Sequence, residues 1–220
     1  MKKIIQTINR RKFLHSTAIT AVGAGTMGLF PLNSFGNPDP GDDIHIIRPV
    51  KGYSLQIGIL VSMLNWKRES VIRATKGLTQ TELDFQMDPK SNSIGALLLH
   101  LAATDVLYQD KTFYGIKTGF SDANKNWAVP MNLGEEGRKQ IKGNNLDYYL
   151  SALQEVREKT LSEFKKRDDK WFAEVDPSFF GKKPTNTFCK WFHVCEHEAN
   201  HRGQITMIRK RLPGNEAEKD

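Results

Sequence analysis

Two histidines near the C-terminus are spaced so that both imidazoles can bind one metal ion. His197 and His201 stand at positions i and i+4 of a stretch that contains no internal proline and stops at Pro213-Gly214, as a helix does. Residues four apart lie one turn apart on the same helix face, and two such imidazoles form half of a divalent-metal site. The same face carries apolar residues, so both imidazoles are expected to point into the core: Val194, Ile205, Ile208 and Leu212.

The alternative interpretation of this pair is structural. One imidazole would pack and hydrogen-bond in the core while the other is exposed. A pair of buried imidazoles without partners is costly, however, and a metal ion is the usual resolution. The pattern therefore favours a metal site over simple core polarity.

A third histidine is expected to reach the same ion. His100 is the strongly polar residue of the otherwise apolar stretch Ile94 to Ala103, which Ser93 should begin as a helix N-cap. A lone histidine in such a stretch is commonly a satisfied core residue. Beside a second helix that offers two inward imidazoles, His100 becomes the natural third ligand. Three neutral imidazoles leave coordination positions for water or substrate, as in catalytic sites.

Two polar residues of the C-terminal helix are candidates for supporting roles. Gln204 shares the histidine face and is expected to hydrogen-bond a ligand imidazole or a bound water. His193 extends the histidine row by one turn. Three residues of one straight helix cannot all reach one small ion, so His193 is expected at the rim of the site.

Two charged residues of the same helix complete the candidate set. Arg202 is expected to pair with an acid of a neighbouring helix, for which Asp105 is a candidate. Glu198 follows His197 directly and lies about 100° round the helix from it. An exposed or supporting position is therefore expected for Glu198 rather than a role as general base.

Taken literally, the segment from His197 to His201 matches H-E-x-x-H, the metal-binding helix of zincin peptidases. The extended form of that motif requires glycine at 204 and histidine at 207, where the chain has Gln204 and Met207. The other form requires an acidic ligand on a further helix, and the acids that follow, Glu216 and Glu218, lie in a polar tail. A peptidase cleft also uses an edge strand, and no useful β-alternation is visible. A peptidase is therefore disfavoured.

Hydrophobic periodicity and capping signals predict an all-α fold. The expected helices cover Tyr53 to Lys76, Ser93 to Tyr108, Asn145 to Lys166 and Thr187 to Leu212. The stretch from Gln109 to Asn144 contains five glycines and is long for a bundle connection, so it should cross over the bundle and can cover its open end. Asp168 to Pro184 is expected to be a loop whose aromatic residues plug the bundle. The prediction is a four-helix bundle with a long crossover connection between its second and third helices.

The first 37 residues are expected to be an export signal rather than part of the fold. The segment Asn9-Arg10-Arg11-Lys12-Phe13-Leu14 resembles a twin-arginine signal, and the apolar segment that follows is short for a membrane span. Residues 38–50 are expected to be a linker, 51–213 the bundle and 214–220 a polar tail. We therefore expect an exported protein of the periplasm or cell envelope, with no membrane span in the mature chain. Retention of the leader as an anchor stays open.

The net charge argues against nucleic acid as a partner. The formal charge is +7 at pH 7, and subtracting the five positive residues of the leader leaves +2. A charge of this size is not the footprint of a nucleic-acid-binding protein.

The two cysteines, Cys189 and Cys195, stand six positions apart on one predicted helix, so they are too far apart to bridge each other.

The motifs together resemble those of the DinB-like (YfiT-like) family. The resemblance rests on Ser93-Ile94-Gly95-x4-His100-Leu101, followed by His197-x3-His201-Arg202-Gly203-Gln204-Ile205. It covers about Tyr53 to Leu212. It implies a four-helix bundle in which three histidines bind one divalent transition metal, commonly zinc or nickel. Carried over to this chain, the ligands are His100, His197 and His201.

The resemblance leaves three functions open. Members of the family include hydrolases and thiol-dependent S-transferases. The thiol co-substrates of the transferases are cytoplasmic, so export favours a metal-dependent hydrolase that acts on a small substrate through metal-bound water. The alternatives are an S-transferase and a non-catalytic metal-binding or ligand-binding protein of the envelope. No general base is identified, and a homodimer is compatible with bundles of this kind.

Overall fold

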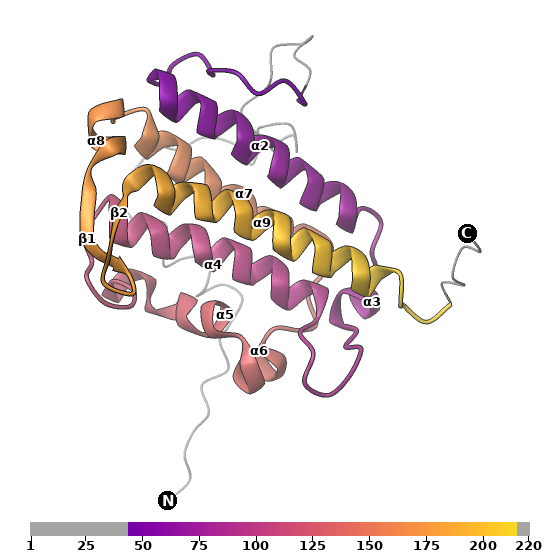
Figure 1. Ribbon diagram of the computed structural model, residues 1–220. Helices are drawn as coiled ribbons and strands as arrows, with labels where there is room; N and C mark the ends of the chain where they lie inside the picture. Colours follow the sequence, from indigo (N-terminus) through magenta and orange to yellow (C-terminus); the bar gives the residue numbers. More distant parts are fainter. Residues whose placement is uncertain (1–43, 215–220) are drawn as a thin grey trace, which may run out of the picture.

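The computed structural model describes residues 44–214 (Figure 1). The predicted leader, residues 38–43 of the predicted linker and all of the predicted tail except Gly214 lie outside the described residues. Within this range the fold is the expected all-α bundle, with one small sheet beside it. None of the described helices combines the length and apolar character that crossing a membrane requires.

The longest helices of the described range form the bundle. They are α2 (Leu55–Thr75), α4 (Ile94–Thr112), α7 (Leu146–Phe164) and α9 (Thr187–Arg209). Three of them begin at an N-cap side chain, because Ser93, Asn145 and Asn186 each accept a hydrogen bond from a backbone N–H of the first turn. The predicted N-cap at Ser93 is thus confirmed. Helix α2 is capped from outside, where the carboxylate of Asp169 accepts from the backbone N–H groups of Gln56 and Ile57.

The long helices pack as two parallel pairs, α4 with α7 and α2 with α9. Along α4 and α7, Asp105 contacts Arg157 and Gln109 contacts Thr160, so the two helices run in the same direction. Along α4 and α9 the order is reversed, since His100 contacts His197 while Tyr108, further along α4, contacts His193. Because α4 and α7 are parallel, the chain must return along the bundle between them, over about 28 Å for a helix of this length.

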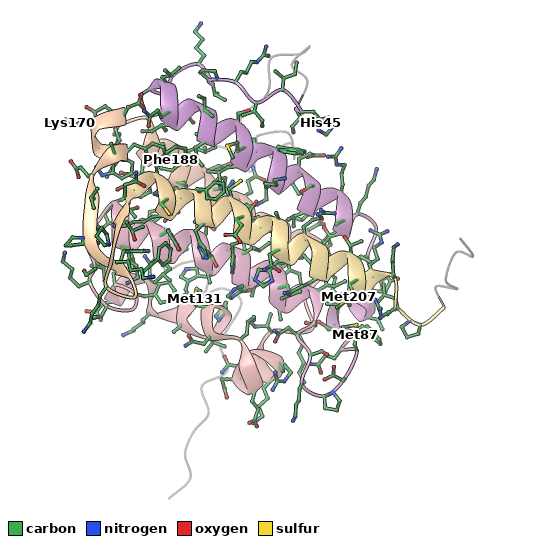
Figure 2. All side chains as sticks on the ribbon, viewed as in Figure 1. His45, Met87, Met131, Lys170, Phe188 and Met207 are labelled. Atoms are coloured by element: carbon green, nitrogen blue, oxygen red, sulfur yellow. The ribbon has the colours of Figure 1, made fainter. Side chains whose placement is uncertain are left out.

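The returning segment carries short helices that cover one side of α4 (Figure 1). They are the 3₁₀-helix η1 (Asp122–Trp127), α5 (Ala128–Asn132) and α6 (Gly134–Gln140). Helix α5 lies against α4, with the hydroxyl of Thr104 4.0 Å from the sulfur of Met131; Figure 2 labels Met131 beside the bundle. The predicted crossover connection is therefore present and partly helical.

A β-hairpin follows α7, where the sequence predicted a loop. After the short helix α8 (Asp169–Ala173), β1 (Val175–Phe180) pairs antiparallel with β2 (Lys183–Asn186). Gly181 and Lys182 both have positive φ, as a type I′ hairpin turn requires. The expectation that the chain has no strand was wrong, because strands this short, with Pro177 in the first, carry little alternation.

Between α2 and α4, the short helix α3 (Gln80–Asp84) begins with a Thr79–Glu82 capping box.

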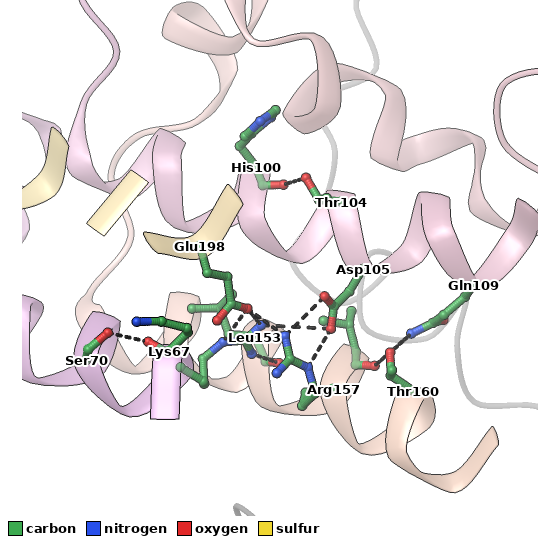
Figure 3. A network of polar contacts seen from close by, with 12 residues as sticks. Lys67, Ser70, His100, Thr104, Asp105, Gln109, Leu153, Arg157, Thr160 and Glu198 are labelled. Atoms are coloured by element: carbon green, nitrogen blue, oxygen red, sulfur yellow. Dashed lines mark hydrogen bonds and ion pairs between the residues drawn. The ribbon is translucent and has the colours of Figure 1, made fainter. Parts of the chain in front are cut away.

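A layer of charged side chains divides the core into two apolar clusters. One cluster contains Leu97, Leu153 and Ile205, and the other contains Leu60, Phe164 and Trp191. The long helices each send one buried charged residue into the layer: Arg68, Asp105, Arg157 and Glu198. Figure 3 shows Asp105 and Glu198 turned towards Arg157. Two positive and two negative groups balance, which is what makes burial of four charges tolerable.

Candidate metal centre

Three imidazoles converge between α4 and α9. The Nε2 atom of His197 lies 3.2 Å from Nε2 of His100 and 3.1 Å from Nε2 of His201. His100 is buried and the other two are half-buried, and one ring nitrogen from each lies within 4.8 Å of the others. The structure thus brings together the three histidines that the sequence singled out as ligands.

The outer nitrogens of two of these rings are fixed by oxygen acceptors. The backbone oxygen of Pro130 lies 3.0 Å from Nδ1 of His100, and Oε1 of Gln204 lies 2.9 Å from Nδ1 of His201. A carbonyl oxygen can only accept, so Nδ1 carries the proton in both rings and Nε2 presents its lone pair. Gln204 thus hydrogen-bonds a candidate ligand, as expected. The role of Pro130 was not predicted, because a backbone carbonyl leaves no mark in the sequence.

Burial keeps the cluster neutral. Desolvation lowers the pKa of His100. Desolvation and the neighbouring imidazoles of His201, His100 and His193 lower the pKa of His197 to about 3. Desolvation and the neighbouring imidazole of His100 also lower the pKa of His201. Neutral imidazoles are the form that binds metal ions.

The donor set fits a divalent transition metal. The lone pairs of His100 and His201 both face Nε2 of His197, which can donate a proton to only one of them. The other contact would then join two lone pairs at close range inside the protein. A cation among the three nitrogens removes that repulsion, and ligands of a tetrahedral ion bound at ~2.0–2.1 Å lie about 3.3 Å apart, close to the spacing seen. The outer nitrogen of the third ring, Nδ1 of His197, is buried and has no hydrogen-bond partner among the described residues.

The charged candidates lie away from these nitrogens. Asp105 binds Arg157 through both carboxylate oxygens, at 2.9 and 3.2 Å. Arg202 is exposed, so the predicted pairing of Arg202 with Asp105 was wrong. Neither Arg157 nor Arg68 was expected as the partner of Asp105, since contacts between helices far apart in sequence leave no local pattern.

Glu198 is buried in the ionic layer rather than exposed. Its Oε1 accepts from Nη2 of Arg68 at 2.5 Å and from Nη2 of Arg157 at 2.6 Å. The side chain of Glu198 is therefore held in the ionic layer by two arginines. The local geometry therefore disagrees with a zincin mechanism, in which this residue would activate water.

Two further residues of α9 complete the description of the site. The ring of His193 lies 5.7 Å from that of His197, but its nitrogens are outside the three-nitrogen cluster, in agreement with a place at the rim. Gly203 is exposed and has open space where a Cβ would stand. The glycine that permits close packing is Gly95 of α4, where a Cβ would lie 2.6 Å from the hydroxyl of Tyr149.

Comparison with known proteins places this geometry in a family. The family model for mycothiol-S-transferase matches residues 59–214, which include all the helices of the bundle except the first turn of α2. The chain belongs to the mycothiol-S-transferase family. That family is part of the DinB/YfiT-like superfamily, so the resemblance found in the sequence is confirmed.

The fold of this mycothiol-S-transferase family member is similar to that of a solved structure. The crystal structure, described as the conserved protein of locus from Enterococcus faecalis, superposes with a TM-score of 0.52 at 15% identity. The match covers 69% of this chain and 94% of that chain, which supports the fold alone. No curated protein matches the chain.

Proposed function

We propose that this protein is a metal-dependent S-transferase that joins a low-molecular-weight thiol to a small electrophile. Two observations support the proposal: the family to which the chain belongs, and the three converging imidazoles. The observation that carries it is that the Nδ1 atoms of His100 and His201 are engaged by oxygen acceptors while their Nε2 atoms face one point. Such a cluster can hold a metal ion, and the mycothiol-S-transferase family indicates a thiol as the co-substrate.

The reaction forms a sulfur–carbon bond and breaks the bond between that carbon and its leaving group. The thiol proton is released and the leaving group departs with the bonding electron pair. A divalent ion held by His100, His197 and His201 would lower the pKa of the thiol and hold its sulfur. The protein keeps these three imidazoles neutral by burial, and Pro130 and Gln204 keep two of them correctly turned.

A hydrolase is the second candidate, and one specific observation favours it. Three imidazole donors leave coordination positions open to water as well as to a thiol. The two functions share the metal and differ in the nucleophile, so the product distinguishes them. The ion pairs of Glu198 leave both without an assigned general base.

The test is a product analysis with the purified bundle, from about residue 44, loaded with zinc or nickel. The protein is incubated with 1-chloro-2,4-dinitrobenzene in the presence and absence of small thiols, and products are separated by mass. A metal-dependent thioether that His100→Ala does not form supports the transferase. A metal-dependent phenol without thiol supports the hydrolase instead. Neither product from loaded protein, with this and related electrophiles, contradicts both and favours a binding protein.

Export is a separate proposal, because the leader lies outside the described residues. We propose that the twin-arginine segment carries the folded chain across the cytoplasmic membrane. Replacing Arg10 and Arg11 by lysine should retain the protein in the cytoplasm, as judged by cell fractionation. Export would require that the thiol is available outside the cytoplasm. If the wild type and the lysine variant showed the same distribution between the cytoplasm and the exported fraction, export through this signal would be contradicted.

A further inference from the structure

His193 lies at one end of the histidine row, and a buried hydroxyl holds its ring. The hydroxyl oxygen of Tyr108 is 2.8 Å from Nδ1 of His193. The two rings stack with an interplanar angle of 20°. Tyr108 is only 4% exposed, whereas His193 is half-buried. The pair therefore presents one side of an imidazole near the surface and anchors the other side in the core.

The burial of Tyr108 determines which group donates the hydrogen bond. Desolvation raises the pKa of the phenol, so the hydroxyl keeps its proton. Within the part of the chain that the structure describes, that hydroxyl forms its hydrogen bond with His193. If Nδ1 carried the imidazole proton, the buried O–H would have no acceptor, at substantial energetic cost. Tyr108 therefore donates to Nδ1, and the proton of the neutral imidazole lies on Nε2.

This tautomer explains why His193 is not a fourth ligand and suggests what it does instead. A protonated Nε2 cannot bind a metal ion, but it can donate a hydrogen bond. The centre of the His193 ring lies 5.7 Å from that of the His197 ring and 5.4 Å from that of the Phe180 ring. Phe180 belongs to β1 and is 36% exposed. Beside the three-histidine cluster there is thus an N–H donor next to an accessible aromatic ring.

We propose that the Nε2–H of His193 donates a hydrogen bond to the sulfur of the thiol co-substrate, with the ring of Phe180 as the adjoining apolar wall. Tyr108 is then a positioning residue, because it acts only through the orientation and tautomer of His193. An N–H aimed at a developing thiolate stabilises its charge and directs its lone pair. This inference rests on the proposed S-transferase function, since the acceptor is the sulfur of the thiol.

The test measures thiol binding directly, without turnover. Cobalt-loaded protein is titrated with 2-mercaptoethanol, and binding is followed through the thiolate-to-cobalt charge-transfer absorption. His193→Phe keeps an aromatic ring against Phe180 but removes the donor, and should weaken binding about tenfold, the usual effect of losing a hydrogen bond to a charged group. His193→Gln restores an N–H and should recover part of the affinity. Every variant is first shown to hold cobalt in the same ratio as the wild type.

Two tyrosine variants examine the positioning role. Tyr108→Phe removes the hydroxyl and should weaken binding in the same direction, while Tyr114→Phe removes an exposed hydroxyl and should leave it unchanged. The ring ¹⁵N shifts of His193 in the metal-free protein should show a proton on Nε2, and Tyr108→Phe should change them. A proton on Nδ1 in the wild type would overturn the inference.

The outcomes separate this inference from the function on which it rests. If wild-type cobalt protein shows no charge-transfer band with thiols, the S-transferase proposal fails and this inference falls with it. If the wild type binds the thiol and His193→Phe binds it equally well, only the inference is overturned. Weaker binding by His193→Phe, with recovery in His193→Gln, supports both.

Discussion

Oε1 of Glu198 lies 2.6 Å from Nη2 of Arg157, in the middle of the bundle and one residue along the chain from a candidate metal ligand. The same oxygen also accepts from Arg68, and both arginines are almost fully buried. The acid of the H-E-x-x-H pattern is therefore part of the ionic layer that joins α2, α7 and α9. A motif that indicates peptidase chemistry in one fold has a structural role in this one.

Removing the charge of Glu198 should destabilise the fold. Glu198→Gln leaves two buried guanidinium groups with a single carboxylate, and breaking a buried pair in this way costs about 3–5 kcal/mol. The free energy of unfolding, from urea titration followed by circular dichroism, measures the loss. Glu196→Gln, at an exposed position of the same helix, is the control and should change stability by less than about 0.5 kcal/mol. Equal stability of the two variants would show that the layer is not a net structural element.

The metal site should depend on the three converging histidines and not on the others. His100→Ala, His197→Ala and His201→Ala should each lose most of the bound ion, because each removes one donor of three. His45→Ala removes an exposed histidine far along the chain and should retain it, as should His193→Phe. Metal content per chain, after growth with added zinc or nickel and desalting, is the measurement. Full retention by His100→Ala would rule out this ligand set.

The helices and the ligand histidines were predictable because their signals are local. Side-chain caps at Ser93, Asn145 and Asn186 mark three helix starts, and an i,i+4 pair on an apolar face points inward whatever the partner. Contacts between distant segments were not predictable in the same way. Arg68 meets Glu198 across 130 residues of sequence, and each residue alone resembles an ordinary solvent-exposed helix position. The backbone oxygen of Pro130 has no side-chain signature, so its contact with His100 had to come from the structure.

Two glycines should respond oppositely to the same substitution. Gly95→Ala places a methyl group against the buried ring of Tyr149, at 2.6 Å from its hydroxyl and 2.7 Å from its Cζ. The ring of Tyr149 or one of the two helices must therefore shift, at a cost of about 1–3 kcal/mol. Gly203→Ala meets open space within a helix, and the better helix propensity of alanine should stabilise the protein by up to about 1 kcal/mol. Thermal unfolding of the two variants side by side is the measurement. Destabilisation by Gly203→Ala would show that the space beside this glycine is not open in solution.

The metal-free protein should lose stability as the pH falls below about 6.5, the ordinary pKa of histidine. Burial and the neighbouring imidazoles lower the pKa of His197 to about 3 in the folded state. Between these two values the unfolded chain binds more protons than the folded chain, so the free energy of unfolding decreases as the pH decreases.

His197→Gln isolates this contribution from that of the carboxylates. Glutamine does not titrate, so the variant should show a shallower decrease between pH 6.5 and pH 4 than the wild type, although its stability at pH 7 also changes. Urea unfolding of both proteins at several pH values, with a chelator present, gives the two slopes. Carboxylates that titrate in the same range contribute to both slopes and cancel in the difference. Parallel slopes would mean that the imidazole of His197 is as readily protonated in the folded protein as in the unfolded chain, and that burial does not keep the cluster neutral.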